Sequence, residues 1–255
     1  MNKLIELKDV CVDYNENDNV IGVINNVSLV INKNDFICLL GPSGCGKSTL
    51  LKTIAGFIKP NKGEALMDGE IIVKPESKRG IIFQDANLFP WFTVFDNIAL
   101  GPKFMKKDKE EINAICEKYL EQVELSEYRN SKVFELSGGQ RQRVAIARTL
   151  ANNPEVILMD EPFGALDSFT RKKMQIMIRK LWHQNKSTIF FVTHDIDEAL
   201  LLGTDIYIMK SGVPSIVKKY EVNYSKRLLD KPNEHVTKEK EYIKLKEEIL
   251  DLLEN

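Results

Sequence analysis

The chain has 255 residues, of which 43% are hydrophobic and 29% charged, and its formal net charge at pH 7 is −1. This length suits one large α/β domain or a core domain with an inserted subdomain, and the near-neutral charge gives no sign of a nucleic-acid partner. No apolar run approaches the length needed to cross a bilayer, and residues 1–6 lack the apolar core of a signal peptide. We therefore expect a cytosolic protein.

Two segments near the amino terminus, residues 4–14 and 27–31, alternate apolar and polar side chains. A period of two is typical of strands that bury one face and expose the other. The pattern predicts a small antiparallel β layer at the start of the chain.

The apolar run at residues 36–40 leads into residues 41–49, which fit the phosphate-binding pattern G-x-x-x-x-G-K-[ST]. Glycines in this pattern let successive backbone N–H groups point at phosphates, and the N-terminus of the following helix adds to the attraction. The pattern predicts that Lys47 reaches the β and γ phosphates, that Ser48 binds Mg²⁺ and that Thr49 bonds the α phosphate. The predicted nucleotide-binding residues are Gly41, Pro42, Ser43, Gly44, Cys45, Gly46, Lys47, Ser48 and Thr49.

The cysteines divide into two groups. Cys45 lies in the phosphate loop near a lysine and a helix N-terminus, which favour a thiolate, and we expect it to be a reactive handle and not a catalytic group. Cys11, Cys38 and Cys116 show no C-x-x-C spacing, so that neither structural zinc nor a disulfide is expected.

Four short apolar runs, residues 36–40, 156–159, 188–192 and 206–209, are separated by helical stretches. Continuous runs of this length are typical of strands buried on both faces of a parallel sheet. They predict an α/β fold with a P-loop NTPase core, in which flanking helices cover a mostly parallel sheet.

Two further segments have helical periodicity. In approximately residues 88–136, apolar side chains recur at three- and four-residue steps in a charged background, which predicts a helical subdomain inserted into the core. Approximately residues 232–255 are rich in Lys and Glu with amphipathic spacing, which favours a helix packed on the core over a partner-binding tail. We expect one domain, residues 1–255, containing both segments.

Residues 136–140 read Leu-Ser-Gly-Gly-Gln and stand before a helical stretch. A phosphate loop alone leaves kinases, GTPases and many ATPases open, but this string resembles the signature of ATP-binding cassette proteins. A plain helix cap at Ser137 accounts for the serine and not for the whole string. The resemblance implies that the signature binds the γ phosphate of a nucleotide held by a second subunit. The signature residues implied to bind nucleotide are Ser137, Gly138, Gly139 and Gln140.

The resemblance assigns roles to further residues. Asp160 and Glu161 resemble the end of the Walker B strand, so that Asp160 would hold Mg²⁺ and Glu161 would position and deprotonate the attacking water. His194 resembles the switch histidine, which contacts the γ phosphate and orients the water. Gln84 resembles the Q-loop residue, which links the metal site to the helical subdomain. The implied catalytic residues are Lys47, Gln84, Glu161 and His194, and the implied metal ligands are Ser48, Gln84 and Asp160.

Two positions complete the implied nucleotide site. Asp167 lies in a string that resembles the D-loop, which crosses the dimer interface. Tyr14 resembles the aromatic residue that stacks on adenine, although an aromatic residue at a strand end is often only a packing group.

Residues 83–98, 160–167 and 193–199 resemble importers of the nitrate, sulfonate and taurine group. The chain departs from that group in two places: Gln140 stands where Met is frequent, and residues 203–206 lack the common Ala-Asp-Arg. Neither departure touches the residues implied in catalysis.

The resemblance covers roughly residues 4–210 and implies the ATP-hydrolysing motor subunit of an importer, with ATP and Mg²⁺ as cofactors. Two copies would enclose two ATP molecules, and integral membrane permease subunits would dock near Gln84 and the helical insert. An external solute-binding protein would be an indirect partner. The chain would then work at the cytoplasmic face of the membrane.

Other functions stay open at this point. A soluble cassette ATPase could do conformational work on a macromolecular assembly, but its usual markers, a long coiled coil, tandem cassettes or a basic arm, are absent from the sequence. A P-loop kinase is disfavoured because it gives residues 136–140 no role. The cargo of an importer could be nitrate, a sulfonate such as taurine, or a pyrimidine-type nutrient.

Overall fold

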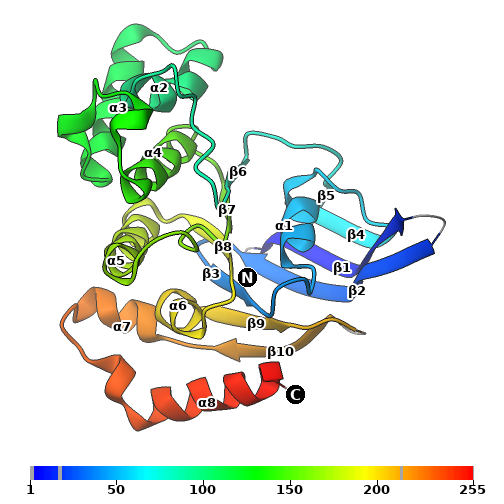
Figure 1. The fold of residues 1–255 in the computed structure, drawn as a ribbon. Helices are drawn as coiled ribbons and strands as arrows, with labels where there is room; N and C mark the ends of the chain where they lie inside the picture. Colours follow the sequence, from blue (N-terminus) through cyan, green and yellow to red (C-terminus); the bar gives the residue numbers. More distant parts are fainter. Residues whose placement is uncertain (1–2, 17–18, 213–214, 255) are drawn as a thin grey trace.

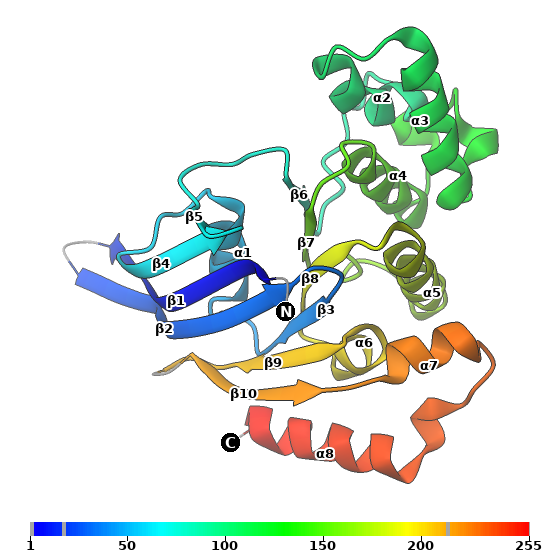
Figure 2. The ribbon, with the colours of Figure 1, turned by 180° about the vertical axis from the view of Figure 1, so that it is seen from behind.

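The computed structural model describes residues 3–16, 19–212 and 215–254. These residues form two β-sheets with helices packed around them (Figure 1 and Figure 2). None of the helices in these ranges is long and apolar enough to span a membrane.

The smaller sheet is antiparallel throughout and comes from the first part of the chain. Its first strand alternates as the sequence predicts, because Ile5 and Leu7 are buried whereas Lys8 is exposed. In spatial order the strands are β2 (Asn19–Asn32), β1 (Lys3–Glu16), β4 (Lys62–Met67) and β5 (Glu70–Ile71). The predicted antiparallel layer is confirmed.

The larger sheet contains all four predicted apolar runs as strands. In spatial order the strands are β10 (Ile216–Glu221), β9 (Asp205–Met209), β3 (Phe36–Leu40), β8 (Thr188–Thr193), β7 (Val156–Asp160) and β6 (Arg79–Ile82). All neighbours are parallel except β10, which pairs antiparallel with β9. The predicted mostly parallel core is confirmed, and the carboxyl ends of its strands meet at one edge.

In chain order, the described helices are α1 (Lys47–Ala55), α2 (Val94–Phe104), α3 (Lys109–Gln122), α4 (Gly138–Leu150), α5 (Ser168–Asn185), α6 (Ile196–Leu202), α7 (Tyr224–Asp230) and α8 (Lys240–Glu254). Short 3₁₀ turns lie at η1 (Ser126–Tyr128), η2 (Val133–Glu135) and η3 (Val236–Lys238).

The larger sheet separates two hydrophobic cores. In β3, Phe36 and Cys38 belong to the core with α4, α5 and α6, whereas Ile37 and Leu39 belong to the core with α1 and the antiparallel sheet. Successive side chains of a strand point to opposite faces, so this alternation shows that both faces of the sheet are covered. α1 and α4 therefore lie on opposite faces, as Figure 1 also shows.

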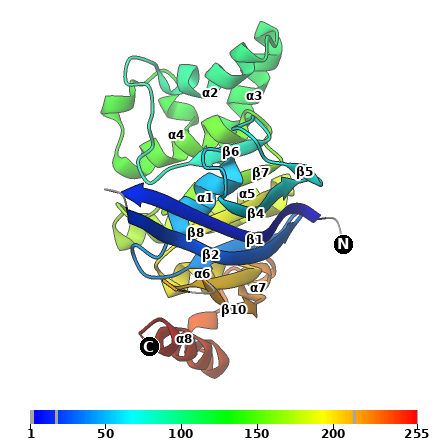
Figure 3. The same cartoon turned by 90° about the vertical axis from the view of Figure 1, so that its right-hand side faces the viewer.

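Two helical groups lie at opposite ends of the molecule (Figure 3). α2 and α3 fall within the range expected for the inserted subdomain and pack on α4. At the other end, α8 buries Tyr242 and Ile249, and the Tyr242 ring lies 5.1 Å from the ring of Tyr224 in α7. The boundaries of the insert and the tail remain predictions.

Candidate active site

The phosphate loop joins β3 to α1 and depends on glycine at three positions. Gly44 and Gly46 have φ values of +82° and +103°, which glycine adopts without strain. A Cβ atom on Gly41 would collide with the carbonyl oxygen of Met209, and one on Gly46 would lie 2.9 Å from that of Val23. The loop is therefore wedged between β9 and β2, which holds it at the carboxyl edge of the larger sheet.

Lys47 points into the phosphate loop, with 4% of its side chain exposed. Its Nζ donates to the carbonyl oxygens of Gly41 and Pro42, both at 2.9 Å, and lies 3.6 Å from Glu161 Oε1. These oxygen atoms compensate for the loss of water around the buried ammonium group.

Ser48 and Asp160 meet at the carboxyl end of β7. Ser48 Oγ donates to Asp160 Oδ1 at 2.8 Å. Burial raises the pKa of the Asp160 carboxyl group, and the hydrogen bond from Ser48 acts against this shift. A desolvated carboxylate beside a hydroxyl group fits Mg²⁺, which takes one or two carboxylates and completes its shell with phosphate oxygens and water. The described ranges contain no cluster of three His, Cys, Asp or Glu side chains that could hold a metal by itself.

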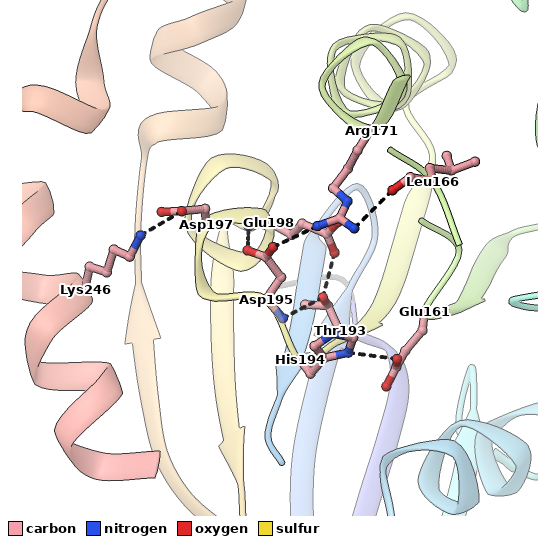
Figure 4. A network of polar contacts seen from close by, with 9 residues as sticks. All are labelled: Glu161, Leu166, Arg171, Thr193, His194, Asp195, Asp197, Glu198 and Lys246. Atoms are coloured by element: carbon pink, nitrogen blue, oxygen red, sulfur yellow. Dashed lines mark hydrogen bonds and ion pairs between the residues drawn. The ribbon is translucent and has the colours of Figure 1, made fainter. Parts of the chain in front are cut away.

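Glu161 follows β7 directly and lies between Lys47 and His194. Its Oε2 is 2.8 Å from His194 Nδ1 (Figure 4), whereas its other carboxylate oxygen, Oε1, is the one that faces Lys47. The backbone φ of Glu161 is +45°, in the left-handed region that is uncommon for residues other than glycine, and its N–H donates to Val192 O of β8 at 3.0 Å. Strained backbone of this kind persists where neighbouring contacts fix it and is frequent at active sites.

Gln84 lies just after β6, beside the turn that follows Glu161. A Cβ atom on Gly164 would lie 3.2 Å from Gln84 Nε2. The structure thus joins Ser48 with Asp160, joins Lys47 and His194 through Glu161, and places Gln84 next to this group. The sequence predictions for these residues describe one place in the molecule.

The signature segment lies elsewhere, at the N-terminus of α4. Ser137 Oγ accepts from the N–H of Gln140 at 3.3 Å, and Gln140 Oε1 accepts from the N–H of Ser137 at 2.8 Å, which forms a capping box. Within the described part of the chain, no hydrogen bond or ion pair joins residues 137–140 to residues 41–49. One copy of the chain therefore does not bring the signature to its own phosphate loop.

Asp167 and Tyr14 are both accessible. Asp167 Oδ1 accepts from the N–H groups of Phe169 and Thr170, each at 3.0 Å, and the bonds with Thr170 lower the pKa of the Asp167 carboxyl group. Tyr14 is 43% exposed in β1 and pairs with Ile21 of β2, the strand that abuts the phosphate loop. Their nucleotide contacts remain predictions.

The expectation of a reactive Cys45 is wrong. The residue is 2% exposed, and burial raises the pKa of its thiol although the charge of Lys47 acts in the opposite direction. The sequence places Cys45 next to a lysine but does not reveal that its side chain turns into the apolar core beneath the loop.

Sequence reasoning missed a polar network behind His194. Thr193 Oγ1 donates to Glu198 Oε2 at 2.6 Å, and Arg171 Nε lies 3.8 Å from Glu198 Oε1 (Figure 4). One signal was available in the sequence, because Glu198 is an acidic residue that directly precedes the apolar stretch 199–202. The acid is 4% exposed, and buried carboxylates require partners.

Comparison with known proteins places these contacts in a family context. Residues 24–164 match the family model described as ABC transporter. The chain is 41% identical over 237 residues to the taurine import ATP-binding protein of Roseobacter denitrificans, which covers 93% of this chain and 88% of that protein. It is 45% identical over 221 residues to the aliphatic sulfonates import ATP-binding protein of Bacillus thuringiensis subsp. konkukian, which covers 87% of each.

The fold is also similar to the dimeric structure of MJ0796, a bacterial ABC transporter cassette. The TM-score is 0.76 and the identity 36%, over 86% of this chain and 99% of that chain. A dimeric post-hydrolysis state of the same cassette, bound to ADP and Pi, gives a TM-score of 0.75 at 36% identity over the same shares of the two chains.

Proposed function

The chain belongs to the ABC transporter family as an ATP-binding subunit, and on this premise we propose that it hydrolyses Mg-ATP as a dimer to drive uptake of a sulfonate-type solute. The identity to import ATP-binding proteins supports the transport function over a soluble cassette ATPase that works on a macromolecular assembly.

The contacts of Glu161 carry this proposal. Its carboxylate bridges His194 and Lys47 at the edge where the phosphate loop ends. In this arrangement Lys47 exchanges its carbonyl partners for β and γ phosphate oxygens, Glu161 takes a proton from the attacking water, and His194 orients that water against the γ phosphate. Gln84, beside Gly164, would link the nucleotide site to the helical insert and transmit a change at the site to that insert.

Ser48, Asp160 and Gln84 are the residues that would hold Mg²⁺. When bound, Mg²⁺ supplies positive charge against the phosphate oxygens. The Ser48 to Asp160 contact and the desolvated Asp160 carboxylate support this assignment, since a cation would compensate for the burial of that charge.

The separation of the signature from the phosphate loop supports a dimer. Ser137 and Gln140 sit at an exposed helix N-terminus, on the opposite face of the sheet from α1. A second copy, related by a two-fold axis, would bring its signature and its Asp167 turn to the γ phosphate held by the first. Tyr14 would stack on adenine from β1. Hydrolysis would remove the phosphate that joins the two copies and so open the dimer.

A groove beside α2 supports docking of a membrane subunit. It measures about 580 Å³, and its walls include Phe57, which is 56% exposed, and Phe104, which is 80% exposed. Arg148 of α4 lines the same groove and donates to the carbonyl oxygens of Ala86 and Asn87, in the segment after Gln84. An exposed aromatic groove next to the segment after Gln84 suits an apolar helix of an integral membrane partner. The chain would then be peripheral at the cytoplasmic face of the membrane.

The import names of the relatives support a sulfonate cargo. One relative imports taurine and another imports aliphatic sulfonates, at identities of 41% and 45%. The solute would be selected by the membrane subunits and by an external solute-binding protein, so that uptake of labelled taurine and methanesulfonate by the assembled transporter tests this part of the proposal.

The Glu161→Gln variant tests the catalytic assignment. We expect hydrolysis to fall at least hundredfold while an ATP-bound dimer persists in size-exclusion chromatography with Mg-ATP, because the amide keeps its shape but cannot take a proton. Glu155→Gln is the matched control, since Glu155 is a partly exposed acid whose carboxylate pairs with Lys33 and Lys78. A variant that stays monomeric at saturating Mg-ATP, or that hydrolyses ATP normally, contradicts the assignment.

A further inference from the structure

We propose that Arg171 is a positioning residue for hydrolysis, which ties the turn that carries Asp167 to the loop that carries His194. The proposal rests on the roles proposed above for Glu161 and His194. Arg171 lies near the start of α5 and makes no hydrogen bond or ion pair with Glu161 or His194. Its effect on these two residues would therefore pass through the residues between them.

On one side, Arg171 fixes the turn before α5. Its Nη2 donates to the carbonyl oxygen of Leu166 at 3.2 Å. Leu166 directly precedes Asp167, whose carboxylate caps the same helix. The arginine therefore holds the end of the turn that would cross to a second copy.

On the other side, the same guanidinium faces two acids at the start of α6. Its Nη1 donates to Asp195 Oδ2 at 3.4 Å, and its Nε lies 3.8 Å from Glu198 Oε1. The N–H of Glu198 donates to Asp195 Oδ1 at 3.0 Å, which holds the two acids side by side. Without a cation between them, these carboxylates would repel one another in a poorly solvated place.

The Thr193 hydroxyl group links Glu198 to the backbone on the other side of His194. Thr193 Oγ1 donates to Glu198 and accepts from the N–H of Asp195 at 3.0 Å. His194 lies between Thr193 and Asp195 in the chain, and its ring nitrogen Nδ1 contacts the Glu161 carboxylate. Figure 4 shows this path from Arg171 to Glu161, and a small cavity is lined by Arg171, Glu161 and His194 together. A shift of Arg171 would therefore move the histidine relative to the carboxylate.

An ion pair that only stabilises the packing of α5 on α6 would make the same contacts. Kinetic measurements distinguish this structural role from a role in positioning His194. For Arg171→Ala we expect the kcat for ATP hydrolysis to fall about tenfold, since small displacements of catalytic groups have large effects on rate, while the KM for ATP stays within about twofold. A stability effect alone would lower the fraction of active protein and leave kcat per active site unchanged.

A double-mutant cycle with His194→Ala gives the sharper readout. If Arg171 acts through His194, the double variant should be no slower than His194→Ala alone, within about twofold. Arg143→Ala is the matched control, because Arg143 also donates to one backbone carbonyl, that of Val123, and to one acid, Glu124. We expect this control to hydrolyse ATP at the normal rate.

Arg171→Lys keeps the test decisive if Arg171→Ala does not fold. A lysine keeps the charge but cannot bond Leu166 and both acids at once, so we expect an intermediate loss of about threefold. Additive losses in the cycle, or normal kcat in both Arg171 variants, would overturn the proposal. If instead Glu161→Gln and His194→Ala themselves hydrolyse ATP normally, the proposed catalytic site is wrong and the failure lies there.

Discussion

The carboxyl edge of the larger sheet and the signature end of α4 are built in different ways. At the edge, side chains from distant parts of the sequence contact one another: Ser48 bonds Asp160, and Glu161 bridges Lys47 and His194. At the signature, the side chains of Ser137 and Gln140 bond to each other's backbone N–H groups. The hydrogen bonds and ion pairs of the first region join distant segments of one copy, whereas the side-chain hydrogen bonds of Ser137 and Gln140 join residues three apart.

This difference is the one that the proposed dimer leads us to expect in a single chain. A complete catalytic group has long-range partners that compensate for burial, as Lys47 does with loop carbonyls and Glu161. In the proposed dimer, the signature would gain its nucleotide contacts only from the second copy. Substitutions in the two regions should therefore separate nucleotide binding from dimer formation.

The largest effect is expected at the carboxyl edge, for Lys47→Ala. In the proposed site the Lys47 ammonium group binds the phosphates, so its removal should weaken ATP binding by about hundredfold or more in a calorimetric titration. Lys52→Ala in the same helix is the control, since that exposed lysine lies outside the predicted phosphate-binding residues. An unchanged affinity in Lys47→Ala would show that residues 41–49 are not the phosphate site.

A smaller effect, confined to the dimer, is expected for Ser137→Ala. The isolated copy should bind ATP normally, while hydrolysis falls about tenfold because the proposed contact between the signature and the γ phosphate would be weaker. The loss of the helix cap also costs about 1 kcal/mol of stability. Asp108→Ala is the matched control, because Asp108 caps α3 through the N–H of Glu111 at 2.8 Å. Equal losses of hydrolysis in both variants would show that Ser137 acts only as a helix cap and not through the nucleotide.

Thiol alkylation should show that the Cys45 side chain, beneath the phosphate loop, is inaccessible to reagents in solution. Cys11 is partly exposed, whereas Cys45 is buried with a raised thiol pKa, so iodoacetamide at pH 8 should modify Cys11 about tenfold faster in the folded protein. Peptide mass spectrometry after timed quenching measures the two rates. Faster modification of Cys45 would restore the reactive cysteine that the sequence predicts.

The smallest effect is expected outside both regions, in Tyr242→Phe. The Tyr242 hydroxyl group donates to Asp197 Oδ1 at 2.7 Å, and Lys246 contacts the other carboxylate oxygen at 2.7 Å. Loss of one hydrogen bond should lower the free energy of unfolding by about 1 kcal/mol and change hydrolysis less than twofold. Urea denaturation and an ATPase assay measure the two quantities. A large loss of hydrolysis would instead extend the catalytic network into α8.

The sequence predicts what depends on local pattern. Four strands of the larger sheet, β3, β7, β8 and β9, follow from their apolar runs, whereas β6 and β10 were not predicted. The positions of Lys47 and Asp160 follow from motifs that lie at strand ends. The orientation of Cys45 does not follow, because burial depends on the core beneath the loop. Arg171 was missed for a similar reason, since its partners Leu166, Asp195 and Glu198 come from two further segments that only the fold brings together.

The central position of β3 has a consequence for hydrogen exchange. Its backbone pairs with β8 on one side and β9 on the other, and all five side chains are buried. Amides in such a strand exchange with deuterium only when the whole domain opens. The phosphate loop is thus attached to one of the best-protected elements of the fold, so that the loop could rearrange around a nucleotide while residues 36–40 retain their protection.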